Sequence, residues 1–250
     1  MTTSLDIVIP VLNEEADLAP SVGKLRDFMS DYLNDYHWRV VVADNGSTDS
    51  TPDIGRRLAE EDERIGYVRL GQRGRGRALS RAWRESEADI VGYMDVDLST
   101  DLAALPPLVE AIRSDGYDVA VGSRFRPGAR IIDRSLGREL ISRTYGVLFR
   151  SMFFTGFRDA QCGFKALTRQ TAQAIVPHIK NDNWFFDTEL LIIAAKRGYR
   201  IKQVPVKWSD DPSTTVNIAR TAAEDIKGLL RLRFRGIPRV DPPGGALPER

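Results

Sequence analysis

The first 122 residues alternate between short apolar runs and amphipathic stretches, and this alternation restricts the fold more than any other feature of the sequence. Apolar runs of this length predict buried strands, and the amphipathic stretches between them predict helices. The predicted strands span residues 5–10, 39–43, 65–70, 90–94 and 119–121. The predicted helices span residues 14–33, 51–61, 77–86 and 102–114. Such alternation predicts an α/β fold with a Rossmann-like, mostly parallel sheet flanked by helices.

The alternation weakens in the second half of the chain. An arginine-rich segment comes first, and the pattern then predicts strands at residues 164–167 and 200–208, a helix at 187–197 and a final helix from about Val216. We expect one domain over residues 1–236, made of the halves 1–122 and 123–236. The last residues, 237–250, are rich in Pro and Gly and predict a flexible tail.

Composition excludes several classes of function. The 36 Lys and Arg residues nearly cancel the 35 Asp and Glu residues, so the chain lacks the overall positive field that nucleic-acid-binding proteins use. The single cysteine, Cys162, excludes a disulfide framework and cysteine-based zinc sites, and the two histidines argue against a histidine metal cluster. The N-terminus lacks the features of a signal peptide, and no window approaches the roughly 20 apolar residues of a membrane span. We therefore expect a cytoplasmic protein.

Two carboxylates follow the fourth predicted strand. In Asp95-Val96-Asp97 the alternate side chains of an extended segment share one face. Such a pair suits Mg²⁺ or Mn²⁺, which take oxygen ligands and share the rest of their coordination shell with substrate phosphates. The alternative is a polar strand end, with Asp97 or Ser99 capping the next helix. Because sheets of this kind bind ligands at the carboxyl ends of their strands, the position favours the metal.

Three other segments offer contacts for anions or nucleosides. Residues 44–49, after the second predicted strand, carry a carboxylate for a base or ribose, or form only a turn that caps a helix. The spacing in residues 71–77 fits neither a Walker loop nor an NAD-binding loop, but Arg75 and two neighbouring arginines can meet a phosphate, unless they form only a solvated turn. Seven arginines between residues 124 and 150 predict an anion site, with an exposed basic helix face as the alternative.

Nine short motifs can be compared with known enzymes. The more general ones are residues 9–14, 43–47, 74–76 and 95–97. The narrower ones are residues 122–124, 138–143, 159–166, 184–189 and 204–208. With these motifs the chain resembles the family 2 glycosyltransferases of the GT-A fold, and within them the polyprenyl- or dolichyl-phosphate sugar synthases, over residues 5–233. The strings at residues 161–165 and 186–190 are most similar to the dolichyl-phosphate glucosyltransferase branch.

The resemblance implies a role for each matching position. The residues implied to bind the nucleoside are Pro10, Asn13, Glu14 and Asp44. The residues implied to hold Mg²⁺ or Mn²⁺ and the diphosphate are Asp95 and Asp97, and those implied to face the phosphates are Arg124 and Arg138. The candidates for contacts with sugar hydroxyls are Asp159, Asp187 and Glu189, with a structural ion pair to Arg or Lys as the alternative.

The resemblance also implies the reaction, which moves a hexose with inversion from a nucleoside-diphosphate sugar to a polyprenyl phosphate. A lipid phosphate is already ionised near neutral pH, so the reaction demands no strong general base. Ser99 stands where the mannose synthases carry a metal-binding glutamine, so we expect a UDP-sugar, with glucose ahead of an N-acetylhexosamine, instead of GDP-mannose. Residues 210–215 lack the basic side chains usual after the last strand, so some substrate contacts differ there.

Two basic apolar segments, residues 138–157 and 226–235, predict docking at the inner face of a membrane without crossing it. The alternatives are packing on the sheet or a homodimer interface, and a soluble acceptor also stays open.

Other classes of function fit less well. A nucleotidyltransferase would carry a glycine-rich loop after the first strand, where this chain has Pro10-Val11-Leu12-Asn13-Glu14. A non-catalytic sugar-nucleotide-binding protein would not turn over its donor, and a nucleic-acid-binding module would need a contiguous basic face.

Overall fold

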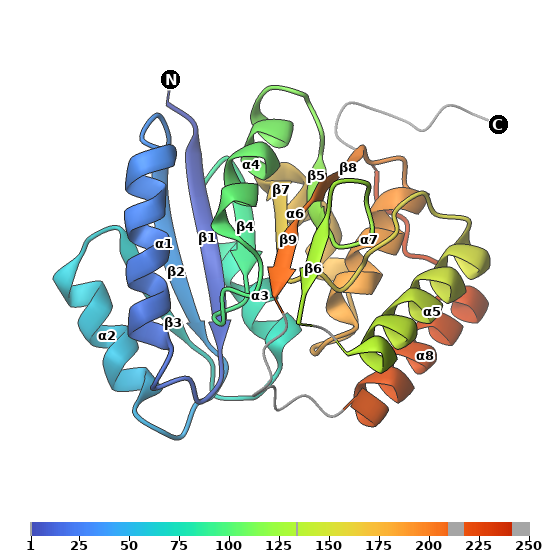
Figure 1. Ribbon diagram of the computed structural model, residues 1–250, viewed down its shortest axis with the longest axis horizontal. Helices are drawn as coiled ribbons and strands as arrows, with labels where there is room; N and C mark the ends of the chain where they lie inside the picture. The colour runs from blue at the N-terminus through green and yellow to red at the C-terminus, as the bar shows by residue number, and fades with distance from the viewer. Residues whose placement is uncertain (1, 134, 210–217, 242–250) are drawn as a thin grey trace.

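The computed structural model describes residues 2–133, 135–209 and 218–241. Its centre is a seven-stranded sheet in the order β3-β2-β1-β4-β7-β5-β8 (Figure 1). The strands are β1 Ser4–Val11, β2 His37–Asp44, β3 Ile65–Arg69, β4 Ile90–Met94, β5 Val119–Ser123, β7 Phe164–Thr168 and β8 Ile201–Pro205. Neighbouring strands are parallel except at β7, which runs antiparallel to β4 and β5. The predicted α/β fold with a mostly parallel sheet is confirmed.

Helices cover both faces of the sheet. They are α1 Leu18–Tyr32, α2 Thr51–Glu61, α3 Arg75–Glu85, α4 Leu105–Arg113, α5 Leu136–Phe153, α6 Arg169–Ile175, α7 Phe186–Lys196 and α8 Ile218–Arg235, with 3-10 turns at Leu102–Ala104 and Val176–His178. Alternate strand residues point to opposite faces. Ile7 and Ile9 join the core cluster that α1, α2 and α4 cover, whereas Val8 joins the cluster that contains residues of α3, α5, α6, α7 and α8. Burial on both faces explains why the strands read as continuous apolar runs.

The strand predicted at residues 200–208 is two strands. β8 ends at Pro205, which has no N–H to donate to a ladder. The chain then leaves the large sheet, and β9, Lys207–Ser209, pairs in parallel with β6, Arg130–Ile132. Neither β6 nor α6 has a counterpart among the predicted elements, because elements of three and seven residues carry too little periodic pattern.

The helices α5 and α8 lie side by side at one end of the sheet (Figure 1). Their inward faces bury Phe149 and Phe153 from α5, and Leu229 and Leu232 from α8. In the part of the chain that the structure describes, no helix combines the length and the apolar character needed to cross a membrane.

Residues 237–241 pack against the domain. Arg197 donates hydrogen bonds to the main-chain carbonyls of Ile237 at 2.5 Å and Pro238 at 2.7 Å. Val240 is buried in the core, and the Tyr199 hydroxyl donates to the carbonyl of Asp241 at 2.9 Å. The predicted boundary of the tail, at residue 237, is therefore too early, because residues 237–241 belong to the domain. Residues 242–250 lie outside the described residues.

Candidate active site

The candidate site lies at the edge where three neighbouring parallel strands end. β2, β1 and β4 are adjacent in the sheet, and Val11 at the end of β1 aligns with Asp44 at the end of β2. The loop after β1 carries Asn13, and the turn after β4 carries Asp95. Because β7 runs the other way, the loop that precedes it, residues 159–163, reaches the same edge. The topology thus brings four predicted site segments to the edge at which such sheets bind ligands.

The loops after β1 and β2 are tied together around Asp44. Asn13, whose φ of 58° lies in the left-handed region that asparagine tolerates, accepts a hydrogen bond from the Thr48 N–H at 2.8 Å. The Asn13 N–H donates to the Ser47 hydroxyl at 3.0 Å. Asp44 is fully buried and accepts from the Ser47 N–H at 2.8 Å and from the Tyr67 hydroxyl at 2.7 Å. Burial, and then the neighbouring Asp44 carboxylate, raise the pKa of Tyr67, so this hydroxyl stays a donor.

The two other residues predicted to bind a nucleoside lie beside these loops. Pro10 pairs with Ala43 near the ends of β1 and β2. The Glu14 N–H donates to the Thr51 hydroxyl, at the start of α2, at 2.8 Å. The four predicted nucleoside contacts therefore come together, although their role stays a prediction.

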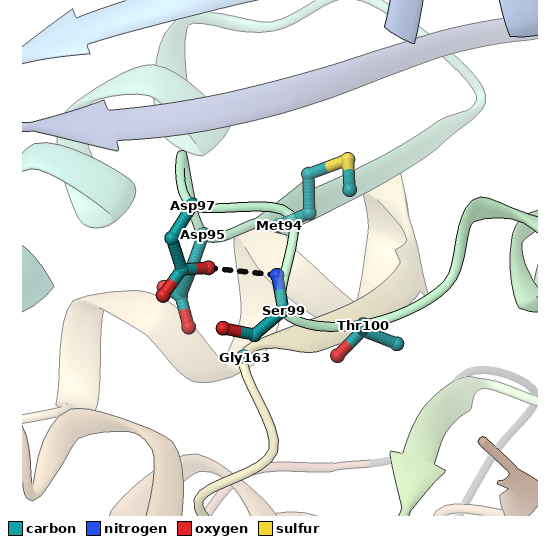
Figure 2. A pocket seen from close by; sticks show the side chains of 6 residues that line it. All are labelled: Met94, Asp95, Asp97, Ser99, Thr100 and Gly163. Carbon is teal, nitrogen blue, oxygen red and sulfur yellow. Dashed lines mark hydrogen bonds between the residues drawn. The ribbon is translucent and has the colours of Figure 1, made fainter. Parts of the chain in front are cut away.

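Asp95 and Asp97 lie in the turn after β4 and line a small pocket, and their carboxylates point the same way in Figure 2. The other residues that line the pocket are Met94, Ser99, Thr100 and Gly163. Asp97 accepts a hydrogen bond from the Ser99 N–H at 2.9 Å, which holds the turn. The Asp95 N–H donates to the Gly163 carbonyl at 3.2 Å, and a Cβ at Gly163 would overlap the Asp95 carboxylate. Only glycine therefore fits at residue 163 with Asp95 in this position.

The carboxylate pair fits a hard divalent cation as a partial site. Its donors are oxygens, which Mg²⁺ and Mn²⁺ prefer. Among the residues that the structure describes, no group of three His, Cys, Asp or Glu side chains is arranged to hold a metal ion. Asp95 and Asp97 would therefore supply part of the coordination shell, and substrate phosphates and water would supply the rest.

Arg75, the first residue of α3, links Asp95 to a second carboxylate. Its guanidinium donates to Asp95 at 2.6 Å and to Asp187 at 2.8 Å. The Lys165 ammonium lies 2.9 Å from the other oxygen of Asp187, and the Tyr93 hydroxyl donates to that same oxygen. Burial alone would raise the pKa of Asp187, but the charges of Lys165 and Arg75 hold it below its ordinary value. Asp187 is therefore an ionised carboxylate inside a buried network.

Lys165 and Tyr93 are members of this network that the sequence-based set of site residues lacks. Both lie inside predicted strands, where side chains are expected to belong to the core. The sequence feature that could have indicated the network is Lys165, a charged residue between Phe164 and Ala166 in a strand that is buried along most of its length. A buried ammonium requires a charged partner, so a lysine at such a position indicates a nearby carboxylate.

Arg124 and Asp159 form a buried ion pair with each other. Arg124 Nε donates to Asp159 Oδ2 at 2.8 Å, and Nη2 donates to Oδ1 at 2.9 Å. Burial alone would raise the pKa of Asp159, but Arg124 holds it below its ordinary value. The geometry matches the structural ion pair that the sequence left as the alternative for Asp159. The ion pair directs the Arg124 guanidinium at the Asp159 carboxylate. Arg124 is not one of the residues that line the Asp95 pocket.

Glu189 and Arg138 occupy other surroundings. Glu189 is fully buried and accepts two hydrogen bonds from Arg231, at 2.8 and 2.6 Å, and one from the Asn181 N–H at 3.1 Å. Arg138 lies in the first turn of α5, where its N–H donates to the capping residue Ser135 at 3.4 Å, and it does not line the Asp95 pocket. The structure therefore pairs Glu189 with a helix arginine and places Arg138 outside this pocket.

Two comparisons relate the chain to known sequences. The family model described as glycosyl transferase family 2 matches residues 6–177. The glycosyltransferase AglD of Haloferax volcanii is 38% identical over 90% of this chain and 35% of its own length, so this chain spans about a third of that relative. The dolichyl-phosphate beta-glucosyltransferase of Dictyostelium discoideum is 26% identical over 92% of this chain and 74% of its own length.

Solved structures share the fold. The glucosyl-3-phosphoglycerate synthase of Mycobacterium tuberculosis, in complex with Mn²⁺, uridine diphosphate and glucosyl-3-phosphoglycerate, matches with a TM-score of 0.67 and 22% identity, over 95% of this chain and 81% of that chain. At this identity the likeness establishes the arrangement of strands and helices. Together with the family match over most of the chain, it shows that this protein belongs to glycosyltransferase family 2 and is a glycosyltransferase of the GT-A fold.

Proposed function

We propose that this enzyme transfers a hexose, with glucose favoured, from a UDP-sugar to a polyprenyl phosphate with the help of Mg²⁺ or Mn²⁺. The observation that carries the proposal is the pocket of Asp95 and Asp97 beside the joined loops around Asp44. Because β2, β1 and β4 are neighbours, a nucleoside at Asp44 and a diphosphate at the carboxylate pair would occupy adjacent places. The lipid-phosphate glucosyltransferase among the relatives, and the Mn²⁺ and uridine diphosphate in the solved neighbour, support this choice.

The residues of the site suit a displacement at the anomeric carbon. A bound divalent cation would supply positive charge that stabilises the departing diphosphate. Asp95 and Asp97 would hold it, and the hydrogen bond from Arg75 keeps Asp95 oriented. The acceptor phosphate oxygen would form its bond to the anomeric carbon on the face opposite the diphosphate, as the bond to the diphosphate oxygen breaks. This order inverts the anomeric centre and needs no general base, because the acceptor is already ionised near neutral pH.

A thermal-shift panel tests the donor. With Mn²⁺, UDP and UDP-glucose are expected to raise the unfolding midpoint, whereas GDP and GDP-mannose leave it unchanged, because only a ligand of the native state stabilises the fold. At 100 times its Kd a ligand adds about 2.7 kcal/mol, which corresponds to roughly 5–10 °C for a domain of this size. The same panel without Mn²⁺ is the control for metal dependence. A response to GDP compounds alone would assign a GDP-sugar donor.

The acceptor proposal requires contact with a lipid surface, and the outward faces of α5 and α8 provide a candidate. We call these residues the docking face: Leu140, Ile141, Val147, Leu148, Phe154, Ile226, Leu230 and Phe234, all of them exposed. Along α5 and its C-cap residue Phe154 they recur at intervals of seven, and in α8 at intervals of four, so each set forms one stripe. The same two helices also carry exposed cations, which are Arg150, Lys227, Arg233 and Arg235. Apolar stripes with neighbouring cations are typical of helices that lie on anionic membranes.

The structure also corrects the extent of this surface. Phe149 and Phe153 are buried, and Tyr145 and Met152 pack against the core, so only one side of the predicted segment 138–157 is available to lipid. Arg231 binds Glu189, so it belongs to the fold. A variant that tests docking must therefore spare Arg231.

Co-sedimentation with vesicles of phosphatidylcholine, with and without an anionic phospholipid, tests the docking face. The wild type is expected to pellet with the anionic vesicles at low salt. The double variant Arg233→Ser/Arg235→Ser should lose about 2 kcal/mol of attraction, roughly a 30-fold weaker binding, because each cation near the surface adds about 1 kcal/mol. Arg56→Ser/Arg57→Ser on α2, at the opposite end of the molecule in Figure 1, is the matched control. If the wild type pelleted equally with vesicles that contain the anionic phospholipid and with vesicles that lack it, the face would have another role.

A further inference from the structure

Asp225 is a carboxylate in the inward-facing stripe of α8. The stripe continues with Leu229 and Leu232, both buried in the core. Gly228 lies against the ring of Phe185, where a Cβ would overlap the ring. A stripe of this spacing normally carries apolar residues. Asp225 is only 3% exposed, so its carboxyl group occupies a position at which the packing of the helix calls for an apolar side chain.

The carboxyl group of Asp225 is only partly satisfied. Gln161 Nε2 donates to Asp225 Oδ2 at 2.6 Å, whereas Oδ1 is buried and has no hydrogen-bond partner among the described residues. Burial raises the pKa of Asp225 to about 7, and the charges of Glu224 and Asp187 act in the same direction. A buried acceptor without a partner destabilises the fold. An apolar residue would pack better at this position. The hydrogen bond from Gln161 is therefore the feature of Asp225 that an apolar residue could not supply.

Gln161 connects Asp225 to the pocket of the carboxylate pair. Its N–H donates to Asp159 Oδ1 at 3.2 Å, so Gln161 is held between two buried carboxyl groups. Two residues further on, Gly163 packs against the Asp95 carboxylate and accepts the hydrogen bond from the Asp95 N–H. The loop 159–163 is therefore fastened at Gln161 just before it reaches Asp95.

We propose that Asp225 is a positioning residue for the transfer reaction, and that it acts through Gln161 to hold the loop 159–163 against Asp95. The kinetic part of this inference rests on the proposed function. The structural part concerns only the contact between α8 and the loop. The two parts are tested by separate measurements.

The kinetic test compares Asp225→Leu with Asp225→Asn. The leucine fits the apolar stripe but cannot hold Gln161, so the unfolding midpoint should stay at or above that of the wild type. Its kcat should fall about tenfold and the half-saturating Mn²⁺ concentration should rise several-fold, because Asp95 is no longer supported. The asparagine keeps a polar group for Gln161 and should recover most of the activity. Wild-type kinetics in Asp225→Leu, or an equal loss in both variants, would overturn the proposal.

The structural test uses Cys162, the only cysteine in the chain, which lies in the same loop and is buried. Asp225→Leu is expected to increase the rate of its labelling by an aromatic disulfide reagent about tenfold at fixed pH, because accessibility controls the reaction of a buried thiol. Asp225→Asn should label as slowly as the wild type. Leu229→Ala is the matched control, because it opens a cavity in the same stripe and keeps the Gln161 contact.

Equally fast labelling in Asp225→Leu and Leu229→Ala would overturn the proposal, since general loosening of α8 would then explain the result. This measurement needs no substrate. A wild type without activity on any donor would therefore overturn the proposed function and leave the structural test intact.

Discussion

Replacement of Asp97 by alanine is expected to lower kcat for sugar transfer by about 10²–10³-fold or more, because loss of a group that stabilises charge in the transition state has effects of this size. Asp97 is exposed and lies in a turn, where it accepts a hydrogen bond from the Ser99 N–H, so the fold should survive its loss. The measurement is kcat across a Mn²⁺ titration, with the unfolding midpoint recorded for the same preparation.

The control for Asp97→Ala is Asp53→Ala, which removes an exposed carboxylate on α2, outside the site. Asp53→Ala should keep wild-type kcat and wild-type Mn²⁺ dependence. If Asp97→Ala turned over at nearly the wild-type rate with saturating Mn²⁺ or Mg²⁺, the assignment of Asp95 and Asp97 to the metal would be wrong.

Arg124→Met is expected to destabilise the fold by about 3–5 kcal/mol, because it leaves a buried carboxylate without its cation. For a domain of this size the unfolding midpoint should fall by roughly 10 °C or more. Arg124→Met/Asp159→Leu should regain much of the loss, since removal of both partners leaves no buried charge. The measurement is thermal unfolding of the two variants and of the wild type at neutral pH.

This comparison separates two roles for Arg124. The exposed pair of Arg26 and Asp27 provides the control, and Arg26→Met should barely move the midpoint. The resemblance to sugar synthases implies that Arg124 faces substrate phosphates, whereas the structure pairs it with Asp159. An unchanged midpoint in Arg124→Met, together with a large loss of activity, would favour the phosphate contact.

The elements that position the site could be predicted from the sequence, because each is long enough to show its periodicity. The predictions include β1, β2 and β4, whose ends bring together Asn13, Asp44 and Asp95. The antiparallel direction of β7 could not be predicted, because periodicity is the same in both directions. The break at Pro205 has a visible cause in the sequence, but the pairing of β9 with β6 joins segments about 80 residues apart.

The polar residues of the site could be predicted more readily than their partners. Asp95, Asp97 and Asp44 follow predicted strands, where a carboxylate stands out against an apolar run. The partner of Asp187 could not be chosen from the sequence, because Arg75 precedes it by 112 positions. Asp225 attracts no attention in a basic amphipathic helix until the structure shows that it faces inward. Burial, which only the assembled fold reveals, separates the structural ion pairs from the carboxylates at the pocket.

The most direct test of the proposed function follows radiolabelled glucose from UDP-glucose, with Mn²⁺, into vesicles that contain polyprenyl phosphate. The measured quantity is label extracted into the organic phase, with 3-phosphoglycerate as a soluble acceptor in a parallel reaction. The wild type is expected to label the lipid, Asp97→Ala is expected not to label it, and 3-phosphoglycerate should not be glucosylated. Label that stays in the aqueous phase while 3-phosphoglycerate becomes glucosylated, or a lipid labelled only from GDP-mannose, would contradict the proposed function.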